Sequence, residues 1–302
     1  MISRWWIYQR ERFPIVANGL LIAAFSFSTL SFSSMLRSRT AFPTGSAILV
    51  AFFTLLFFFM QLRIADEHKD HEEDKQYRPY LPVPRGVISL KELRGLFIFA
   101  MIAQIALALW LKTSPMVFLL ILVWVYLGLM GKEFFVREWL KDRPFTYMWT
   151  HMFIMPLTDL YASSCDWMVK GNGLPVGFVW FLATSFFNGM ILEIGRKIRA
   201  PEDEEEGVTT YSSAWGKNKA VLSWLGALSL TFACALGAAS RIGFVFPIAA
   251  ILGPLFLGAL FIAYRYLKKP AKKWAKLFEL FAGIWTLIMY LSLGVLPRLL
   301  HF

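Results

Sequence analysis

The chain has 302 residues, of which 57% are hydrophobic, 17% aromatic and only 17% charged. Soluble domains carry about 25% charged residues, so the composition excludes an ordinary soluble protein and indicates a polytopic membrane protein with aromatic residues at the bilayer interfaces. The formal net charge of +11 would suit a nucleic-acid binder, but in a membrane protein it reflects Lys and Arg gathered at the cytoplasmic surface, and we expect no nucleic-acid partner.

Nine apolar segments are long enough to cross a lipid bilayer, which takes roughly 17–25 residues. We therefore predict an all-α polytopic integral membrane protein, with one transmembrane domain over residues 1–302 and about nine helices around a central cavity. The predicted spans are 13–36, 45–63, 92–112, 115–132, 145–166, 174–195, 217–239, 243–266 and 274–297.

Lys and Arg are distributed unevenly between the segments that connect these spans. With the N-terminus inside, the inside segments hold 25 of the 31 Lys and Arg residues. Because short cytoplasmic loops are enriched in these residues, we predict a cytoplasmic N-terminus. The same orientation puts two acidic loops, residues 63–91 and 196–216, on the cytoplasmic side, as a site built from both loops requires.

The first acidic loop follows the second predicted span. Asp66, Asp70 and Asp74 recur every fourth residue, and on a helix this spacing places them on one face, within roughly 80° of arc. Glu67 flanks that face. Such a surface could hold Mg²⁺, the usual partner of a diphosphate, although a solvated charged helix explains an arbitrary acidic run more simply. The proline turns and Arg78 that follow favour a metal-bridged phosphate, because they place fixed cations close to the carboxylates.

At these residues the chain resembles the UbiA superfamily of intramembrane prenyltransferases. The first motif of that family is Asn-Asp-x-x-Asp-x-x-x-Asp, followed shortly by Arg-Pro. Asp66 stands at the Asn position, Glu67 at the first Asp, and Asp70 and Asp74 at the other two, while Arg78 begins the Arg-Pro pair. The resemblance implies that Asp70 and Asp74, supported by Asp66 and Glu67, hold Mg²⁺ on the diphosphate of a polyprenyl donor, and that Arg78 binds the diphosphate.

The second acidic region begins at the end of the sixth predicted span. The family usually has Asp-x-x-x-Asp at this helix end, followed by a Gly-x-x-Thr segment. Glu193 matches the first acid and residues 207–210 match the Gly-x-x-Thr segment, but Lys197 stands where the second Asp is expected. The chain therefore departs from the family pattern at this position.

Two interpretations of this departure stay open. In the first, Glu193 and the acids at 202–206 still bind a second metal, while Arg196, Lys197 or Arg199 contacts phosphate directly, as basic side chains can. In the second, the second metal site is lost and the acidic run is only a solvated helix start.

Other polar residues are additional candidates for substrate binding. Asp159 lies mid-span in the fifth predicted helix, where ionisable residues are costly and often functional. It could contact an acceptor or stabilise an allylic cation, or it could make a hydrogen bond between helices. Asn18 lies in the cytoplasmic third of the first span, where the family often has an Asn. Further basic candidates for the diphosphate are Lys132, Arg137, Lys141 and Arg143.

By resemblance, the reaction is Mg²⁺-dependent transfer of a prenyl group from a polyprenyl diphosphate to a lipid-soluble or aromatic acceptor in the bilayer. A transporter or permease is disfavoured because only Asp159 and His151 offer ionisable groups near the midplane, where transporters place their sites. A CDP-alcohol phosphotransferase is disfavoured because its motif needs an Asp-Gly pair, which the chain lacks. A non-catalytic UbiA-like protein stays open because the second motif is altered.

Overall fold

The computed structural model describes residues 2–111, 114–205 and 207–300, and every regular element in these ranges is a helix. Eight of the described helices are long and apolar enough to cross a membrane, which confirms the predicted all-α polytopic membrane fold. These are α2 (Ile15–Arg37), α3 (Gly45–Lys69), α5 (Leu90–Trp110), α6 (Ser114–Gly131), α10 (Phe178–Arg196), α12 (Lys217–Arg241), α13 (Val245–Lys268) and α14 (Lys272–Gly294).

The remaining elements are short helices that lie between or beside the long ones. They are α1 (Ile2–Arg12), α4 (His71–Tyr77), α7 (Arg137–Lys141), α8 (Pro144–Met152), α9 (Ile154–Trp167), α11 (Tyr211–Trp215), α15 (Leu296–Leu299) and the 3₁₀ turns η1 (Glu133–Phe135) and η2 (Pro201–Asp203).

The fifth predicted span, 145–166, is divided between α8 and α9, so nine continuous spans are corrected to eight and one broken segment. Pro156 explains the break. It has no backbone N–H with which to bond the carbonyl of Met152, and its ring would press against that carbonyl in a continuous helix. α8 accordingly ends at Met152 and α9 begins at Ile154.

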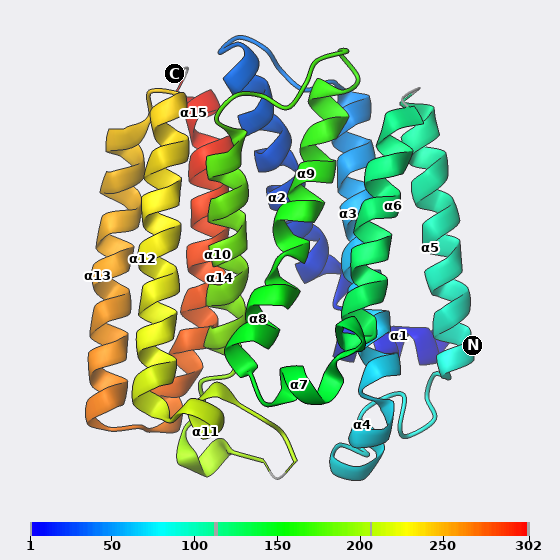
Figure 1. The fold of residues 1–302 in the computed structure, drawn as a ribbon, viewed down its shortest axis with the longest axis vertical. Helices are drawn as coiled ribbons and strands as arrows, with labels where there is room; N and C mark the ends of the chain where they lie inside the picture. Colours follow the sequence, from blue (N-terminus) through cyan, green and yellow to red (C-terminus); the bar gives the residue numbers. More distant parts are fainter. Residues whose placement is uncertain (1, 112–113, 206, 301–302) are drawn as a thin grey trace.

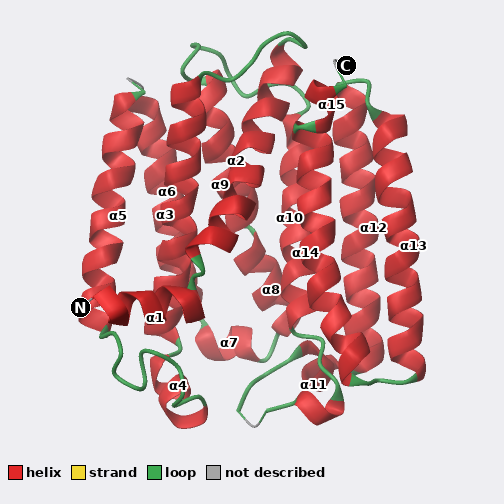
Figure 2. Ribbon diagram, turned by 180° about the vertical axis from the view of Figure 1, so that it is seen from behind, coloured by secondary structure: helices red, strands yellow, loops and turns green. Residues whose placement is uncertain are grey.

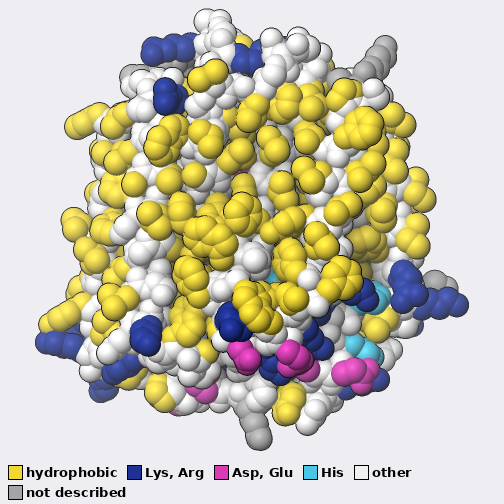
Figure 3. Space-filling view, viewed as in Figure 1, with side chains coloured by type: hydrophobic (Ala, Val, Ile, Leu, Met, Phe, Trp, Pro, Cys, Tyr) yellow, Lys and Arg dark blue, Asp and Glu magenta, His cyan; other side chains and the backbone are white. Residues whose placement is uncertain are grey.

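The long helices run roughly parallel, while α1 lies across one end of the bundle (Figures 1 and 2). The helices α4, α7 and α11 gather at that same end, which we call the charged end. The N-terminus lies there and the C-terminus lies at the opposite end (Figure 1). Hydrophobic side chains cover the middle of the molecule, and most of the charged side chains visible in this view lie at the charged end (Figure 3). This distribution suits a body that spans a lipid bilayer and exposes its charged end to water.

Two apolar clusters hold the bundle together. One contains the buried rings of Trp224, Phe278 and Trp285 on α12 and α14, and the other contains Phe58 and Tyr161 on α3 and α9. Close approach between α10 and α14 depends on a glycine. A Cβ added at Gly195 would lie 2.9 Å from the carbonyl oxygen of Phe278. This contact brings the end of α10 beside the start of α14.

A polar seam joins α2 to α9 and α14 inside the bundle. Asp159 is 2% exposed and accepts hydrogen bonds from the Thr29 hydroxyl at 2.9 Å and the Tyr290 hydroxyl at 2.7 Å. Further toward the C-terminal end of α9, Asp166 pairs with Arg37 at 2.5 Å. Buried carboxylates need partners of this kind. The structure thus gives Asp159 the hydrogen bonds between helices that the sequence left as one of its alternatives.

Candidate functional site

The first acidic motif begins on the last turns of α3, where Glu67 is almost fully buried, at 1% exposed. Its Oε1 accepts hydrogen bonds from Arg12 Nε at 2.5 Å and from Arg63 Nε at 3.2 Å. Tyr8, on the same helix as Arg12, shares a small apolar cluster with Ile64 of α3. Glu67 therefore fastens α1 to α3, and two guanidinium groups already neutralise its charge.

The helix predicted through this motif is interrupted at Asp70. α3 ends at Lys69, α4 begins at His71, and Asp70 between them has φ −94° and ψ 6°. Burial raises the pKa of the Asp70 carboxyl, and the nearby carboxylates of Asp66 and Asp74 raise it further, while Lys69, 3.9 Å away, opposes them. Carboxylates crowded in this way attract a cation.

The other two aspartates of the motif differ in their partners. Asp74 is 2% exposed and pairs with Arg78 Nη2 at 2.6 Å; burial raises its pKa even though Arg78 lowers it. The carboxylate of Asp66 makes no ion pair within 4.0 Å in the described part of the chain, yet it interacts electrostatically with Arg196 on α10. Asp66 and Asp70 are therefore the carboxylates most open to a metal ion.

At the second acidic region, Glu193 lies on the last turn of α10 and is 6% exposed. Its Oε2 pairs with Arg196 Nη2 at 2.5 Å and its Oε1 pairs with Lys197 Nζ at 3.0 Å. Both carboxylate oxygens are thus engaged by cations from the same helix end. Lys197, at the position where the family has an Asp, sits against Glu193 rather than beside a second carboxylate.

The described acids of the run after α10 all have ion-pair or hydrogen-bond partners nearby. Each of its four described acids, 202–205, has a partner within the loop or at the start of α14, and Glu206 lies outside the described residues. The partners are the Lys272 backbone N–H for Glu202, the Lys272 side chain for Asp203, the Thr210 and Ser212 hydroxyls for Glu204, and Arg199 for Glu205. These acids shape the loop, and in this arrangement they converge on no common point.

The two acidic loops meet at the charged end. Gly207 of the second loop has φ +74° and packs so tightly on Tyr77 of the first that an added Cβ would lie 2.6 Å from the ring. Any other residue would be strained by the left-handed backbone and would clash with the ring. This contact therefore fixes the distance between the two loops.

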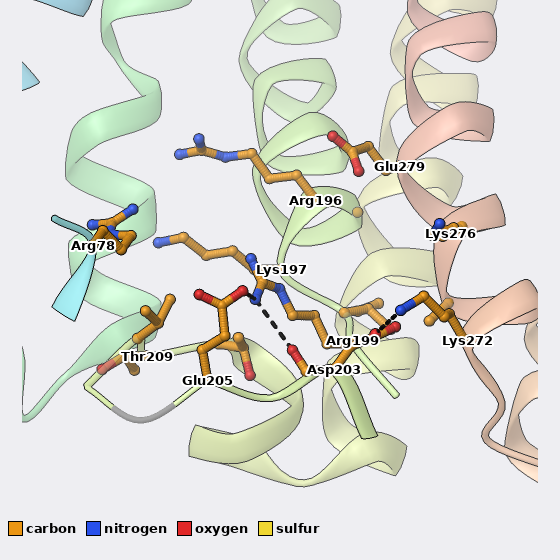
Figure 4. Close-up of a pocket in the computed structure, with 15 residues that line it drawn as sticks. Arg78, Arg196, Lys197, Arg199, Asp203, Glu205, Thr209, Lys272, Lys276 and Glu279 are labelled. Carbon is orange, nitrogen blue, oxygen red and sulfur yellow. Dashed lines mark hydrogen bonds and ion pairs between the residues drawn. The ribbon is translucent and has the colours of Figure 1, made fainter. Parts of the chain in front are cut away.

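A pocket of about 480 Å³ lies beside this contact, between the end of α10, the loop after it and the start of α14 (Figure 4). In Figure 4 the side chains of Arg196 and Lys197 extend toward Arg78, which reaches the pocket from the first loop. Cations outnumber carboxylates in its lining, so the pocket suits an anion. The charged lining residues are Arg78, Arg196, Lys197, Arg199, Lys272, Lys276, Asp203, Glu205 and Glu279.

The structure thus brings together four predicted diphosphate-binding cations and leaves others apart. Arg78, Arg196, Lys197 and Arg199 line one pocket, although they come from loops more than a hundred residues apart. The remaining candidates for substrate binding, none of which lines this pocket, are Lys132, Arg137, Lys141, Arg143, Asn18 and Asp159.

A cluster on α8 was not assigned a role from the sequence. The Tyr147 hydroxyl accepts a hydrogen bond from Lys69 Nζ at 2.8 Å, and the Tyr147 ring stacks on the ring of His151 with centroids 3.9 Å apart. His151 also interacts electrostatically with Asp66 and Glu193, one from each acidic region. The sequence feature that points to this cluster is a histidine inside a predicted span, where ionisable residues are rare.

Comparison with known proteins agrees with this architecture. A solved structure from a study of a digeranylgeranylglyceryl phosphate synthase in membranes is similar, with TM-score 0.64 and 17% identity over 97% of this chain and 98% of that chain. The apo structure of a UbiA homolog from Aeropyrum pernix K1 is also similar, with TM-score 0.69 and 13% identity over 92% of this chain and 98% of that chain. At these identities the likeness shows a shared fold.

No protein of curated function matches the sequence. The model of the UbiA prenyltransferase family, in contrast, matches residues 12–290, which is nearly the whole chain and includes both acidic regions. The chain is an integral membrane protein, with eight long apolar helices and one broken segment among its described residues, and it therefore belongs to the UbiA prenyltransferase family.

Proposed function

We propose that the protein transfers a prenyl group from a polyprenyl diphosphate to a lipid-soluble or aromatic acceptor, in a reaction that requires Mg²⁺. The observation that carries this proposal is the meeting of the two acidic regions, where Arg78 from the first and Arg196, Lys197 and Arg199 from the second line one pocket. Guanidinium and ammonium groups in this arrangement suit a diphosphate, which carries several negative charges.

The carboxylates fit a magnesium ion that is bound jointly with diphosphate. In the described ranges, no three His, Cys, Asp or Glu side chains are grouped so as to hold a metal ion by themselves. Mg²⁺ commonly needs only one or two carboxylates, with waters and substrate phosphates completing its shell. Asp66 and Asp70 are the residues we assign to it, with Asp74 as a third candidate. When bound, the ion would offset the charge that develops on the leaving diphosphate.

Lys197 and Arg196 are assigned to the diphosphate directly. Glu193 has no oxygen left for a second metal, because Arg196 engages one of its carboxylate oxygens and Lys197 the other. Glu193 then keeps the two cations in place, and its negative charge offsets the electrostatic repulsion between them. We thus favour the interpretation in which cations replace the second metal, and Glu193 orients them.

The charged end faces the cytoplasm in this proposal. The inside segments hold 25 of 31 Lys and Arg residues, and all the helix ends that carry the two acidic regions lie at the charged end. Cysteines placed singly at Gln76 and Val208 should both be protected from a membrane-impermeant thiol reagent in intact cells. Labelling of one and not the other would separate the loops and contradict a shared site.

The direct test of function is an assay with purified protein. It is incubated with isotope-labelled dimethylallyl, geranyl, farnesyl and geranylgeranyl diphosphates and a membrane lipid extract, with and without Mg²⁺. We expect a labelled lipid product from at least one donor in the presence of Mg²⁺, and none in its absence. Donor binding without any product would instead indicate a non-catalytic member of the family.

A further inference from the structure

His151 is a buried histidine whose two ring nitrogens have very different surroundings. The side chain is 6% exposed. Nδ1 lies 2.8 Å from the carbonyl oxygen of Tyr147, one turn earlier on α8, whereas Nε2 is buried and has no hydrogen-bond partner among the described residues. A polar atom buried in this way costs free energy unless something binds it.

The contact at Nδ1 fixes the tautomer. A carbonyl oxygen can only accept a hydrogen bond, so Nδ1 carries the hydrogen and donates it to Tyr147. In the neutral imidazole the lone pair is then on Nε2. The geometry therefore presents an unprotonated nitrogen as an unused hydrogen-bond acceptor.

Neighbouring rings hold the imidazole rigidly. Tyr147 stacks on it with ring centroids 3.9 Å apart, and Phe134 makes a T-shaped contact with it, with centroids 5.8 Å apart. Phe134 belongs to a run of three non-glycine residues with positive φ, namely 47° at Glu133, 54° at Phe134 and 59° at Phe135. This conformation is costly for L-residues, and such strain persists where the surrounding structure imposes it, often at functional sites.

The position of His151 ties it to both halves of the proposed site. Its stacking partner Tyr147 accepts a hydrogen bond from Lys69, the residue before Asp70. Its ring also interacts electrostatically with Asp66 of the first acidic region and Glu193 of the second. His151 thus interacts with side chains of both acidic regions, although it does not itself line the 480 Å³ pocket.

From this geometry we infer that His151 is the proton acceptor of the prenyl-transfer reaction, through Nε2. The inference rests on the proposed function. The bond between the first prenyl carbon and the diphosphate oxygen breaks, and its electron pair leaves with the diphosphate. A nucleophilic atom of the acceptor forms the new bond to that carbon, and the proton it carried passes to Nε2. The imidazolium then releases this proton to the diphosphate or to water, which restores the neutral ring.

Two substitutions separate the role of Nε2 from that of the fold. His151→Asn keeps a side-chain N–H where Nδ1 donates to the Tyr147 carbonyl and removes Nε2. His151→Ala opens a space that added imidazole can enter. We expect both to lose product formation by about 10²- to 10⁴-fold, the usual contribution of a general base. Binding of inorganic pyrophosphate with Mg²⁺ should stay within about twofold of wild type in both, since His151 is not assigned to the diphosphate.

Chemical rescue is the decisive measurement. Imidazole added to His151→Ala should restore product formation in proportion to its concentration, while Asp70→Ala, which is inactive for a different reason, should show no rescue. Wild-type product formation by His151→Asn, or the absence of rescue in His151→Ala, overturns the inference and leaves the proposed function intact. A wild-type protein that forms no product with any of the four donors overturns the proposed function and this inference together.

Discussion

The two acidic regions are similar in composition and differ in how their charges are used. In the first, Asp66 makes no ion pair in the described structure, and burial and neighbouring carboxylates raise the pKa of Asp70. In the second, Glu193 and the acids at 202–205 all have cationic or hydrogen-bonding partners. An acidic run thus indicates a cation site only where its carboxylates lie close together and nearby cations or hydrogen-bond donors do not already satisfy them. In the proposed function, the metal therefore binds at the first region, while the diphosphate binds Arg78 of the first region and the cations of the second.

The largest effect is expected from a change in the first region. Asp70→Ala removes one of the two carboxylates, Asp66 and Asp70, that are most open to a magnesium ion. Diphosphate affinity in the presence of Mg²⁺ should fall roughly 100-fold or more, since a bound metal offsets several kcal/mol of charge. Isothermal titration with inorganic pyrophosphate measures this. Thermal stability without ligand should hardly change, and an affinity equal to that of wild type would remove Asp70 from the site.

A second substitution tests whether Glu67 is an anchor of α1. Glu67→Gln removes the charge that pairs with Arg12 and Arg63. We expect the free energy of unfolding to fall by about 3 kcal/mol, the low end of the range for a broken buried pair, because both arginines keep some contact with solvent. Denaturant unfolding in detergent gives this value.

The matched control for Glu67→Gln is Glu72→Ala. Glu72 also lies in the first region but is 84% exposed and only 3.7 Å from Lys75. Its loss should cost less than about 1 kcal/mol. If Glu67→Gln is as stable as this control but loses Mg²⁺-dependent diphosphate binding, Glu67 is a metal ligand, as the family resemblance implies, and the anchor assignment is wrong.

A smaller effect is expected from Lys197, where the chain departs from the family pattern. Lys197→Ala should weaken diphosphate binding by roughly 1.5–3 kcal/mol, the range for a charge-assisted hydrogen bond. Lys197→Asp should weaken it more, by repulsion, unless the new carboxylate recruits a second Mg²⁺. A Mg²⁺ titration of pyrophosphate affinity distinguishes the two cases. Lys219→Ala, at an exposed lysine outside the pocket lining, is the control.

The smallest effect should come from the acids of the second loop. Glu205→Ala removes the partner of Arg199, and both side chains are partly exposed, at 49% and 33%. Such pairs contribute about 1 kcal/mol or less. We therefore expect diphosphate affinity and its Mg²⁺ dependence to change by less than about fivefold. A tenfold or greater loss confined to high Mg²⁺ would show that this loop binds metal after all.

Much of the fold follows from the sequence because hydrophobic length and Lys and Arg placement are local properties. Eight of nine predicted spans correspond to continuous helices. The fifth predicted span, 145–166, is instead interrupted between Met152 and Ile154, because Pro156 cannot bond the carbonyl of Met152. The start of α5 is likewise set by neighbouring residues, because Ser89 and Glu92 form a capping box there.

The site could be predicted only in part because partners come from distant segments. One of the two interpretations that the sequence left open assigned Arg196, Lys197 or Arg199 to phosphate, and these three residues line one pocket with Arg78. The sequence could not show that Arg12 forms an ion pair with Glu67, since the two are 55 residues apart in the sequence. Nor could it show that Nε2 of His151 lacks a hydrogen-bond partner among the described residues, because contacts are visible only in the folded structure.

The measurement that tests the account most directly compares how Asp70→Asn and Glu193→Gln bind Mn²⁺, used as a probe in place of Mg²⁺. Binding is measured in the presence of inorganic pyrophosphate. Each substitution replaces a single candidate metal-binding carboxylate by the uncharged amide of the same size. At saturating pyrophosphate, the account predicts that Asp70→Asn loses the pyrophosphate-dependent Mn²⁺ signal in electron paramagnetic resonance, whereas Glu193→Gln keeps the wild-type signal. Loss of bound Mn²⁺ in Glu193→Gln, with retention in Asp70→Asn, would contradict it and place the metal at the second region.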